Sequence, residues 1–307
     1  MFRFKRPFTT SWTIFFVMAL SIVSAAVLAL LASLLKDTKE EARELDRSQQ
    51  LLMSAKVLDP DGYFLMAQGD GFIPAKNSRG GVLVPSGAEE KATAKDVAQV
   101  YRLRVRPMVV DGSGAVMTYE QAGLQMRSYL AEWKSAKPGS LQYLPIFEIL
   151  PVDGKGVPEA YVIPITGFGL WDRIVGYISI LPDGETVRGI AWYDQKETPG
   201  LGGTIADPSW QKQFLGKKIF QPNEKGVINV ARSPIGITVV KGTVKDVLGN
   251  GPKGENSVDG MAGATLTGNG VTRAYKDNLE LYRPFFEKLR GTDGRKRCVS
   301  VSDGPGV

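Results

Sequence analysis

A long uncharged segment near the N-terminus limits this chain more than any other feature. Residues 7–35 contain no charged side chain, and residues 12–35 are apolar apart from one threonine and three serines. As a helix, those 24 residues reach about 36 Å and span the roughly 30 Å hydrocarbon core of a membrane. A cleaved signal peptide is the competing interpretation, with small residues at 24–26 as its cleavage site. Cleavage there leaves an apolar new N-terminus, so the sequence favours a retained anchor.

Charges on either side of this segment predict its orientation. Arg3, Lys5 and Arg6 precede it, whereas acidic residues outnumber basic ones in residues 37–47. Basic flanking residues stay on the cytoplasmic side of a membrane. We therefore expect residues 1–36 to form a cytoplasmic N-terminus and a single-pass anchor in the lipid bilayer. In a bacterium this is the inner membrane, and the main domain is periplasmic.

The residue inventory excludes many kinds of site. The chain has no histidine and a single cysteine, Cys298. Hydrolysis by a Ser-His-Asp triad, histidine-bound zinc or haem, and cysteine-bound iron–sulfur clusters all need residues that are missing. Carboxylate chemistry, carboxylate-bound cations or an organic cofactor remain. Most of the net charge of +6 comes from the two termini, so no nucleic-acid-binding surface is expected.

The rest of the chain divides into three parts by composition. Residues 37–56 have almost no apolar face and predict a polar helical stalk. Residues 57–290 alternate strand and helix signals and predict an extracytoplasmic α+β domain with an antiparallel sheet and peripheral helices. Residues 291–307 form a basic, polar tail that we expect to be disordered.

Individual elements follow from apolar periodicity and turn residues. Strands are expected over residues 101–110, 115–119, 143–150, 161–166, 173–181 and 186–193, with further strands within residues 226–247. Helices are expected over residues 120–135, over residues 208–215 behind a cap at Asp207, and over residues 271–289 with an interruption at Pro284.

Two glycine-rich segments are candidates for binding chemistry. Residues 197–203 follow a predicted strand, and residues 259–270 precede the last long helix. Small residues such as Gly263, Ala264 and Gly268 let the backbone approach a bulky group, and a helix N-terminus favours a phosphate. Neither segment matches a P-loop or a dinucleotide fingerprint, and most glycine-rich turns before helices are only turns.

The stretch Asp-Gly-Met-Ala-Gly-Ala-Thr from Asp259 to Thr265 resembles the flavinylation motif of FMN-binding domains. In that motif an aspartate precedes a threonine that carries FMN through a phosphoester bond. Together with residues 197–202 and the single apolar span, it is similar to the C subunits of sodium-translocating NADH:quinone oxidoreductases. The similarity covers about residues 162–290, including Gly169-Leu170-Trp171. One position departs from the family, which usually has serine or threonine in place of Ala262.

The resemblance implies a covalent FMN on Thr265, with Thr267 as the second candidate. Either hydroxyl is equally suited to cap the following helix. Trp171, Leu201 and the turn at residues 198–200 are candidates for packing on the flavin ring, and Trp171 is equally a candidate for the core. The predicted cofactor-binding residues are Asp259, Gly263, Ala264, Thr265, Leu266 and Thr267, together with Trp171, Glu197, Thr198, Pro199, Gly200, Leu201 and Gly202. No catalytic side chain and no metal ligand is predicted.

Charged residues near these segments have open roles. Lys217, Lys218 and Arg273 are candidates for contacts with the phosphate or the reduced flavin, and surface solvation is the alternative for at least two of them. Glu197 is a candidate for a hydrogen bond either to the flavin or to its own loop.

The resemblance also implies an electron carrier that is one component of a six-subunit translocase. Electrons from NADH elsewhere in the complex reach this FMN, pass to a flavin on the B subunit and reduce ubiquinone, while Na⁺ is exported. A separate flavin transferase attaches the FMN from FAD, with Asp259 serving recognition and metal-assisted transfer. Two alternatives remain: the G subunit of Rnf-type complexes, which carries the same kind of threonine-linked FMN, and a non-catalytic extracytoplasmic binding module with structural glycines.

Overall fold

The chain forms two compact units, Met1–Asp46 and Arg47–Val307. The computed structural model describes residues 10–69, 71–87, 90–223, 227–249 and 251–300 of the 307. For residues 37, 38 and 292–300 it describes the backbone alone.

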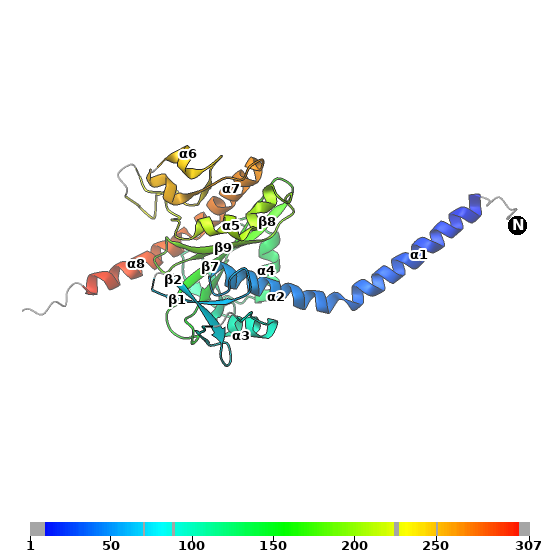
Figure 1. The fold of residues 1–307 in the computed structure, drawn as a ribbon, viewed down its shortest axis with the longest axis horizontal. Coiled ribbons are helices and arrows are strands. Elements are labelled where there is room, and N and C mark those ends of the chain that lie inside the picture. Colours follow the sequence, from blue (N-terminus) through cyan, green and yellow to red (C-terminus); the bar gives the residue numbers. More distant parts are fainter. Residues whose placement is uncertain (1–9, 70, 88–89, 224–226, 250, 301–307) are drawn as a thin grey trace, which may run out of the picture. The chain divides into compact units, whose positions relative to one another are not determined.

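Figure 1 labels the helices and strands in chain order. The helices are α1 (Thr10–Leu34), α2 (Lys36–Ser54), α3 (Ala94–Arg104), α4 (Met126–Ser135), α5 (Pro208–Gln211), α6 (Val244–Leu248), α7 (Thr265–Leu281) and α8 (Arg283–Ser300). The strands are β1 (Phe64–Gln68), β2 (Gly71–Asn77), β3 (Leu83–Pro85), β4 (Val105–Val110), β5 (Val116–Met117), β6 (Leu144–Ile149), β7 (Ala160–Phe168), β8 (Arg173–Ile180), β9 (Val187–Asp194), β10 (Thr238–Val239) and β11 (Ser257–Val258).

The apolar helix expected near the N-terminus is confirmed. α1 has 25 residues and a mean hydropathy of 2.8, and none of its side chains is buried within the structure. Its length and composition allow it to cross a membrane. Among the described residues it is the one helix with both properties, and it indicates membrane anchoring.

The second unit begins within α2, earlier than the residue 57 expected from the sequence. Leu51 and Leu52, near the end of α2, are at most 1% exposed. The Ser54 carbonyl lies against Gly189 of β9, where a Cβ would lie 2.5 Å from the oxygen. Apolar burial and this close backbone contact hold the end of the helix on the edge strand of the sheet. The polar stalk therefore ends before Leu51.

The second unit is built on a six-stranded sheet with the strand order β5-β4-β6-β7-β8-β9, in which all neighbours are antiparallel. A three-stranded antiparallel sheet (β1–β3) and a parallel pair (β10 and β11) accompany it. Helices surround these sheets (Figure 1), so the expected α+β class is confirmed. The β4–β5 and β8–β9 hairpins form at the two turns that the sequence predicts.

Helix α7 packs on the main sheet. Its buried side chains and the isoleucines of β7 and β8 belong to the same hydrophobic core. A Cβ on Gly167 of β7 would lie 2.5 Å from the Cβ of Ala274, so glycine permits this close approach. Because β6 pairs with β7 only as far as Val162, the far part of β7 has an open edge. There the Asn278 amide donates to the Thr166 carbonyl at 2.7 Å and fixes α7 along the strand.

Two element boundaries in the first half of the second unit differ from the prediction. Residues 101–104 end α3 instead of starting a strand, because a capping box between Thr93 and Asp96 begins a helix that continues to Arg104. The helix expected from residue 120 starts at Met126, after a turn with a positive φ of 69° at Gly123. Between residues 226 and 247, the described strand is limited to β10.

The last long helix also differs from the prediction. It begins at Thr265, six residues before the expected start, and breaks at Tyr282 beside Pro284, which lacks a backbone N–H. α8 then continues to Ser300, so the tail expected to be disordered from residue 291 is helical over its described part. Residues 301–307 and the Cys298 side chain lie outside the description.

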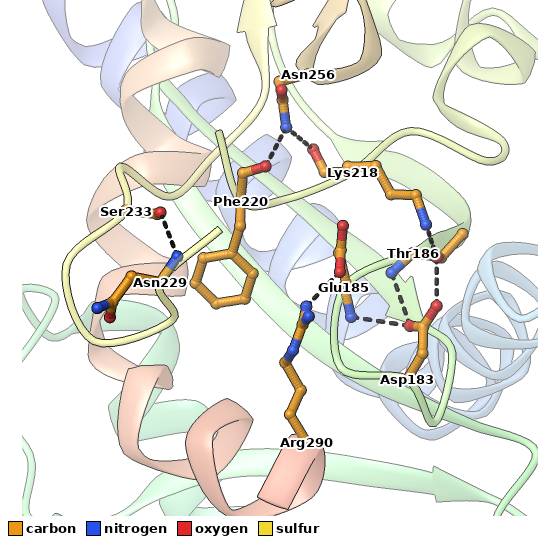
Figure 2. Close-up of polar contacts among 9 residues, drawn as sticks. All are labelled: Asp183, Glu185, Thr186, Lys218, Phe220, Asn229, Ser233, Asn256 and Arg290. Carbon is orange, nitrogen blue, oxygen red and sulfur yellow. Dashed lines mark hydrogen bonds and ion pairs between the residues drawn. The ribbon is translucent and has the colours of Figure 1, made fainter. Parts of the chain in front are cut away.

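Polar side chains fasten the tight turn of the β8–β9 hairpin to the C-terminal part of the unit (Figure 2). Asp183 accepts hydrogen bonds from the backbone N–H groups of Glu185 and Thr186 at 2.9 and 2.8 Å. Glu185 pairs with Arg290 of α8, and Lys218 donates to the Thr186 hydroxyl at 2.6 Å. This end of the hairpin is therefore fixed, and the opposite end leads into the candidate site.

Candidate functional site

Three segments meet beyond the ends of β7 and β9. They are the β7–β8 turn at residues 169–172, the loop at residues 197–203 after β9, and the first turn of α7. β7 and β9 both run antiparallel to β8, which lies between them, so their C-terminal ends lie at the same end of the sheet. α7 packs closely against the same end of the sheet. A Cβ on Gly270 would lie 2.2 Å from the Phe168 carbonyl oxygen, so this approach requires glycine.

The carboxylate of Glu197 lies at the centre of this meeting point and is 4% exposed. One oxygen accepts from the backbone N–H of Trp171 at 3.0 Å. The other accepts from the N–H of Leu170 at 3.1 Å and from the Thr267 hydroxyl at 2.5 Å. Burial works to raise the pKa of Glu197, but these hydrogen bonds, with one more from the Asp172 N–H, outweigh it and lower the pKa. The group is a buried carboxylate that its neighbours keep ionised.

Two glycines enclose this carboxylate. A Cβ on Gly169 would lie 2.4 Å from Oε1 of Glu197. A Cβ on Gly202 would lie 2.5 Å from the Thr267 hydroxyl and 2.7 Å from Oε2 of Glu197. Neither position has room for a side chain, so each glycine lets a separate loop close over the same group.

Thr265 is the first residue of α7 and is exposed. The cap residue before it is Ala264, whose methyl side chain cannot accept a hydrogen bond from the first N–H groups of the helix. Gly263 has a φ of 71°, a conformation that favours glycine and turns the chain into the helix. The Thr265 hydroxyl thus stands at a helix N-terminus, where backbone N–H groups and the helix dipole attract an anion.

The second candidate hydroxyl has a different environment. Thr267 is 1% exposed, and its hydroxyl donates to Glu197. The structure therefore separates two threonines that the sequence leaves as alternatives: one hydroxyl is accessible, and the other is buried in a hydrogen bond.

Large apolar side chains on and beside the three segments are exposed, and we call them the apolar rim. They are Phe168, Leu170, Trp171, Leu201 and Leu266, which are 66%, 48%, 68%, 43% and 61% exposed. Leu201 contacts the helix entrance, since a Cβ on Gly263 would lie 3.0 Å from its Cδ2. The Trp171 indole donates to the Thr198 hydroxyl at 3.2 Å, which joins the two loops. Because Trp171 is exposed, its alternative placement in the core is wrong.

The remaining predicted residues lie at the edges of the site. Thr198, Pro199 and Gly200 are exposed at the tip of their loop. Asp259 is half-buried, and its carboxylate accepts a hydrogen bond at 2.6 Å from the N–H of Val244, which begins α6. Its backbone is also fixed, by a hydrogen bond from the Trp210 indole to the Asp259 carbonyl at 3.0 Å.

Two of the three candidate cations form hydrogen bonds to other parts of the fold. Lys217 donates to the Gly254 carbonyl at 2.7 Å, and Lys218 donates to Thr186, as Figure 2 shows. Burial lowers the pKa of Lys217, although the negative charges of Asp259 and Glu255 act to raise it. Arg273 is exposed on α7.

Sequence reasoning missed Phe168 and Leu170 as members of the apolar rim. The signal was available, because apolar residues alternate with glycine in the turn between two strong strands. It also missed the hydrogen bond between Glu197 and Thr267, for which no local pattern exists.

Comparison with known sequences gives one family model and several relatives. The model of the FMN-binding domain family matches residues 169–280. The C subunit of the Na(+)-translocating NADH-quinone reductase of Chlamydia pneumoniae is 36% identical over 289 residues, which cover 89% of this chain and 90% of that protein. The C subunit of the same reductase from Haemophilus ducreyi is 30% identical over 299 residues, which cover 96% of this chain and 99% of that protein.

Solved structures show the same fold. The crystal structure of the reductase's C subunit from Parabacteroides distasonis aligns with a TM-score of 0.53 at 24% identity, covering 82% of this chain and 96% of that one. The crystal structure of NqrC from Shewanella oneidensis aligns with a TM-score of 0.54 at 24% identity, covering 81% and 99%.

Proposed function

The chain belongs to the family of Na(+)-translocating NADH-quinone reductase C subunits, and from this premise we propose that it carries FMN in phosphoester linkage to Thr265. In this role it relays electrons from NADH towards quinone as one component of a complex that exports Na⁺. It acts as an electron carrier and is not a complete enzyme alone. The observation that carries the proposal is the exposed Thr265 hydroxyl at the uncapped N-terminus of α7.

The helix entrance fits the phosphate of a nucleotide. The first N–H groups of a helix have no partner within the helix, and here the cap residue, Ala264, has no side-chain acceptor for them. Gly263 and Ala264 leave little side-chain bulk before the helix, and Ala262 presents no competing hydroxyl. A phosphate at Thr265 therefore meets free donors and the positive end of the helix dipole.

The choice of Thr265 over Thr267 follows from accessibility. Attachment requires the threonine oxygen to reach the phosphorus of the donor. The Thr265 oxygen is at the surface, whereas the Thr267 oxygen is buried and donates its proton to Glu197. Of the two threonines, Thr265 reaches a donor without any hydrogen bond of the site being broken, whereas Thr267 would first have to leave Glu197.

The attachment step balances without any change of oxidation state. With FAD as the donor, the Thr265 oxygen forms a bond to the phosphorus that bears the flavin. The pyrophosphate bond breaks, AMP leaves, and the hydroxyl proton goes to solvent. A separate flavin transferase performs this step, and we assign to Asp259, fixed at the entrance of α6, a role in its recognition and metal-assisted transfer.

The apolar rim fits the ring system of the cofactor. When bound, FMN supplies the one- and two-electron chemistry that this chain's side chains lack. Trp171, Leu201 and Leu266 offer apolar surface beside the attachment point, which reduces contact between the ring and water. These side chains are exposed, so a flavin that packs on them remains accessible to an electron donor or acceptor.

The anchor defines the setting of this chemistry. α1 crosses the inner membrane once, with the basic N-terminal residues in the cytoplasm and the second unit in the periplasm. The partners are the other members of the six-subunit complex, above all the flavin-carrying B subunit. A covalent bond keeps the flavin at the site in a compartment with little free FMN.

Expression of the full chain together with a flavin transferase tests the proposal. A tryptic peptide that contains Thr265 should gain an FMN phosphoryl group and fluoresce under ultraviolet light. Colourless protein from a host competent for the modification contradicts it and leaves an anchored, non-catalytic binding module.

A further inference from the structure

The hydrogen-bond partners of the Glu197 carboxylate are other residues of the same chain. Its two carboxylate oxygens accept hydrogen bonds from the N–H groups of Leu170 and Trp171 and from the Thr267 hydroxyl. The Asp172 N–H is a fourth donor, so with 4% of the residue exposed the acceptor positions of the carboxylate are filled without a flavin. The role of Glu197 is therefore inside the protein.

These donors come from separate segments of the site. Leu170 and Trp171 form the β7–β8 turn, Glu197 begins the next loop, and Thr267 lies in the first turn of α7. Each of these segments contributes exposed side chains to the apolar rim beside Thr265. A single carboxylate thus ties together all the segments that frame the attachment point.

The backbone fits closely around the carboxylate. Gly169 and Gly202 approach Glu197 and Thr267 so closely that a Cβ on either would lie within 2.5 Å of a side-chain oxygen. The contact is therefore enclosed on two sides, and it is not an incidental surface pair. A second link at the surface joins Asp172 of the turn to Lys196, the residue directly before the loop.

We propose that Glu197 is a positioning residue for flavin attachment: it holds the residue 169–172 turn and the residue 197–203 loop against the first turn of α7, and it withdraws the Thr267 hydroxyl from reaction. Thr265 is then the one hydroxyl of this turn that meets the donor phosphorus. This inference rests on the proposed function, because it concerns the rate and place of FMN attachment to Thr265.

The first experiment measures attachment on the full chain in detergent with a flavin transferase, Mg²⁺ and FAD. Intact mass gives the rate, and peptide mapping gives the residue. Glu197→Gln and Thr267→Val should each slow attachment at Thr265 by about tenfold or more. Glutamine removes the charge and replaces one acceptor oxygen with a donor, and valine removes the hydroxyl that donates to the carboxylate. Thr267→Ser keeps the hydroxyl and should restore the wild-type rate, an outcome that a general packing role does not produce.

Controls separate this role from general loss of a buried carboxylate. Glu148 of β6 is 9% exposed and pairs with Arg106, away from the three segments, so Glu148→Gln should accept FMN at the wild-type rate. If Glu197→Gln and Thr267→Val also match wild type, the inference is overturned while the proposed function stands. If wild type itself takes up no FMN, both are overturned.

A second measurement needs no flavin. Hydrogen exchange of the unmodified full chain should be faster in Glu197→Gln at the amides of residues 170 and 171, which donate to the carboxylate. Unchanged protection of these amides overturns the inference. If Glu197→Gln does not fold, the Thr267→Val and Thr267→Ser pair decides it by the same two readouts, because both retain Glu197.

Discussion

The hydroxyl of Thr267 donates to the carboxylate of Glu197 at 2.5 Å across 70 residues of sequence. This contact unites the two glycine-rich segments of the chain into one site. It also leaves Thr265, two residues earlier and on the surface of the same helical turn, as the accessible hydroxyl. The assignment of the attachment point and the stability of its surroundings therefore depend on the same pair of residues.

Thr265→Val should abolish the FMN adduct and leave the protein folded, because Thr265 is exposed and valine differs from it mainly in lacking the hydroxyl. Intact mass and in-gel fluorescence after expression with a flavin transferase measure the adduct. Thr265→Ser is the matched control and should still be modified. An adduct on Thr267 in the valine variant would contradict the assignment.

Gly202→Ala should destabilise the protein by about 1–3 kcal/mol, because the added methyl group enters the space of the Thr267 hydroxyl and the Glu197 carboxylate. Urea unfolding of the full chain in detergent measures this free energy. Gly112→Ala is the control, since nothing lies within 4 Å of a Cβ there, and it should change stability by less than about 0.5 kcal/mol. Equal effects of the two changes would argue against the enclosed carboxylate.

Glu197 should make stability depend on pH in acid. Its pKa in the folded protein lies below the ordinary 4.5, so its ionised form stabilises the fold fully above that value. The contribution is lost as the pH falls through the lowered pKa. Wild type should therefore unfold at higher urea than Glu197→Gln near neutral pH, and the difference should shrink in acid. A difference that does not change with pH would contradict an ionised carboxylate.

Trp171→Ala should leave stability within about 0.5 kcal/mol of wild type but expose the attached flavin, because the side chain is 68% exposed and lies in the apolar rim. Quenching of flavin fluorescence by iodide measures the exposure and should increase. Val157→Ala, at a residue that is 64% exposed outside the rim, should not change it. Equal quenching in wild type and Trp171→Ala would remove the tryptophan from the flavin's surroundings.

Removal of residues 1–46 should leave a cooperatively folding second unit, whereas removal of residues 1–56 should not. The longer deletion takes away Leu51 and Leu52, and burial of each contributes about 1.5–3 kcal/mol. The loss is a large part of the stability of an ordinary domain. Thermal unfolding by circular dichroism compares the two proteins. Equal midpoints would restore the boundary at residue 57.

The features that sequence predicts well are those with local causes. The apolar span, the tight hairpin turns and the amphipathic pattern of α7 each depend on neighbours within a few residues, and the structure confirms them. The predicted ends of helices and strands are less accurate where a side-chain hydrogen bond determines the end of an element. The capping box of Thr93 and Asp96, for example, begins a helix that continues into residues whose composition favours a strand.

The geometry of the site was not predictable from local pattern. The motif around Thr265 identifies the segment, but it does not reveal that Thr267 is buried or that Glu197 is its partner. Those facts depend on how β7, β9 and α7 converge, which is a property of the completed sheet. The packing of the end of α2 on the second unit likewise involves a distant contact, between Ser54 and Gly189.

The order in which the pieces of the site are synthesised has its own consequence. The ribosome makes the β7–β8 turn first, the Glu197 loop next and the first turn of α7 last, so the enclosed carboxylate cannot form before Thr267 has been added. An enzyme that recognises the assembled geometry meets it only after translation has passed Gly270. Under the proposed function, a copy that ends before α7 lacks Thr265 and takes up no FMN, so colour would report that synthesis had passed this turn.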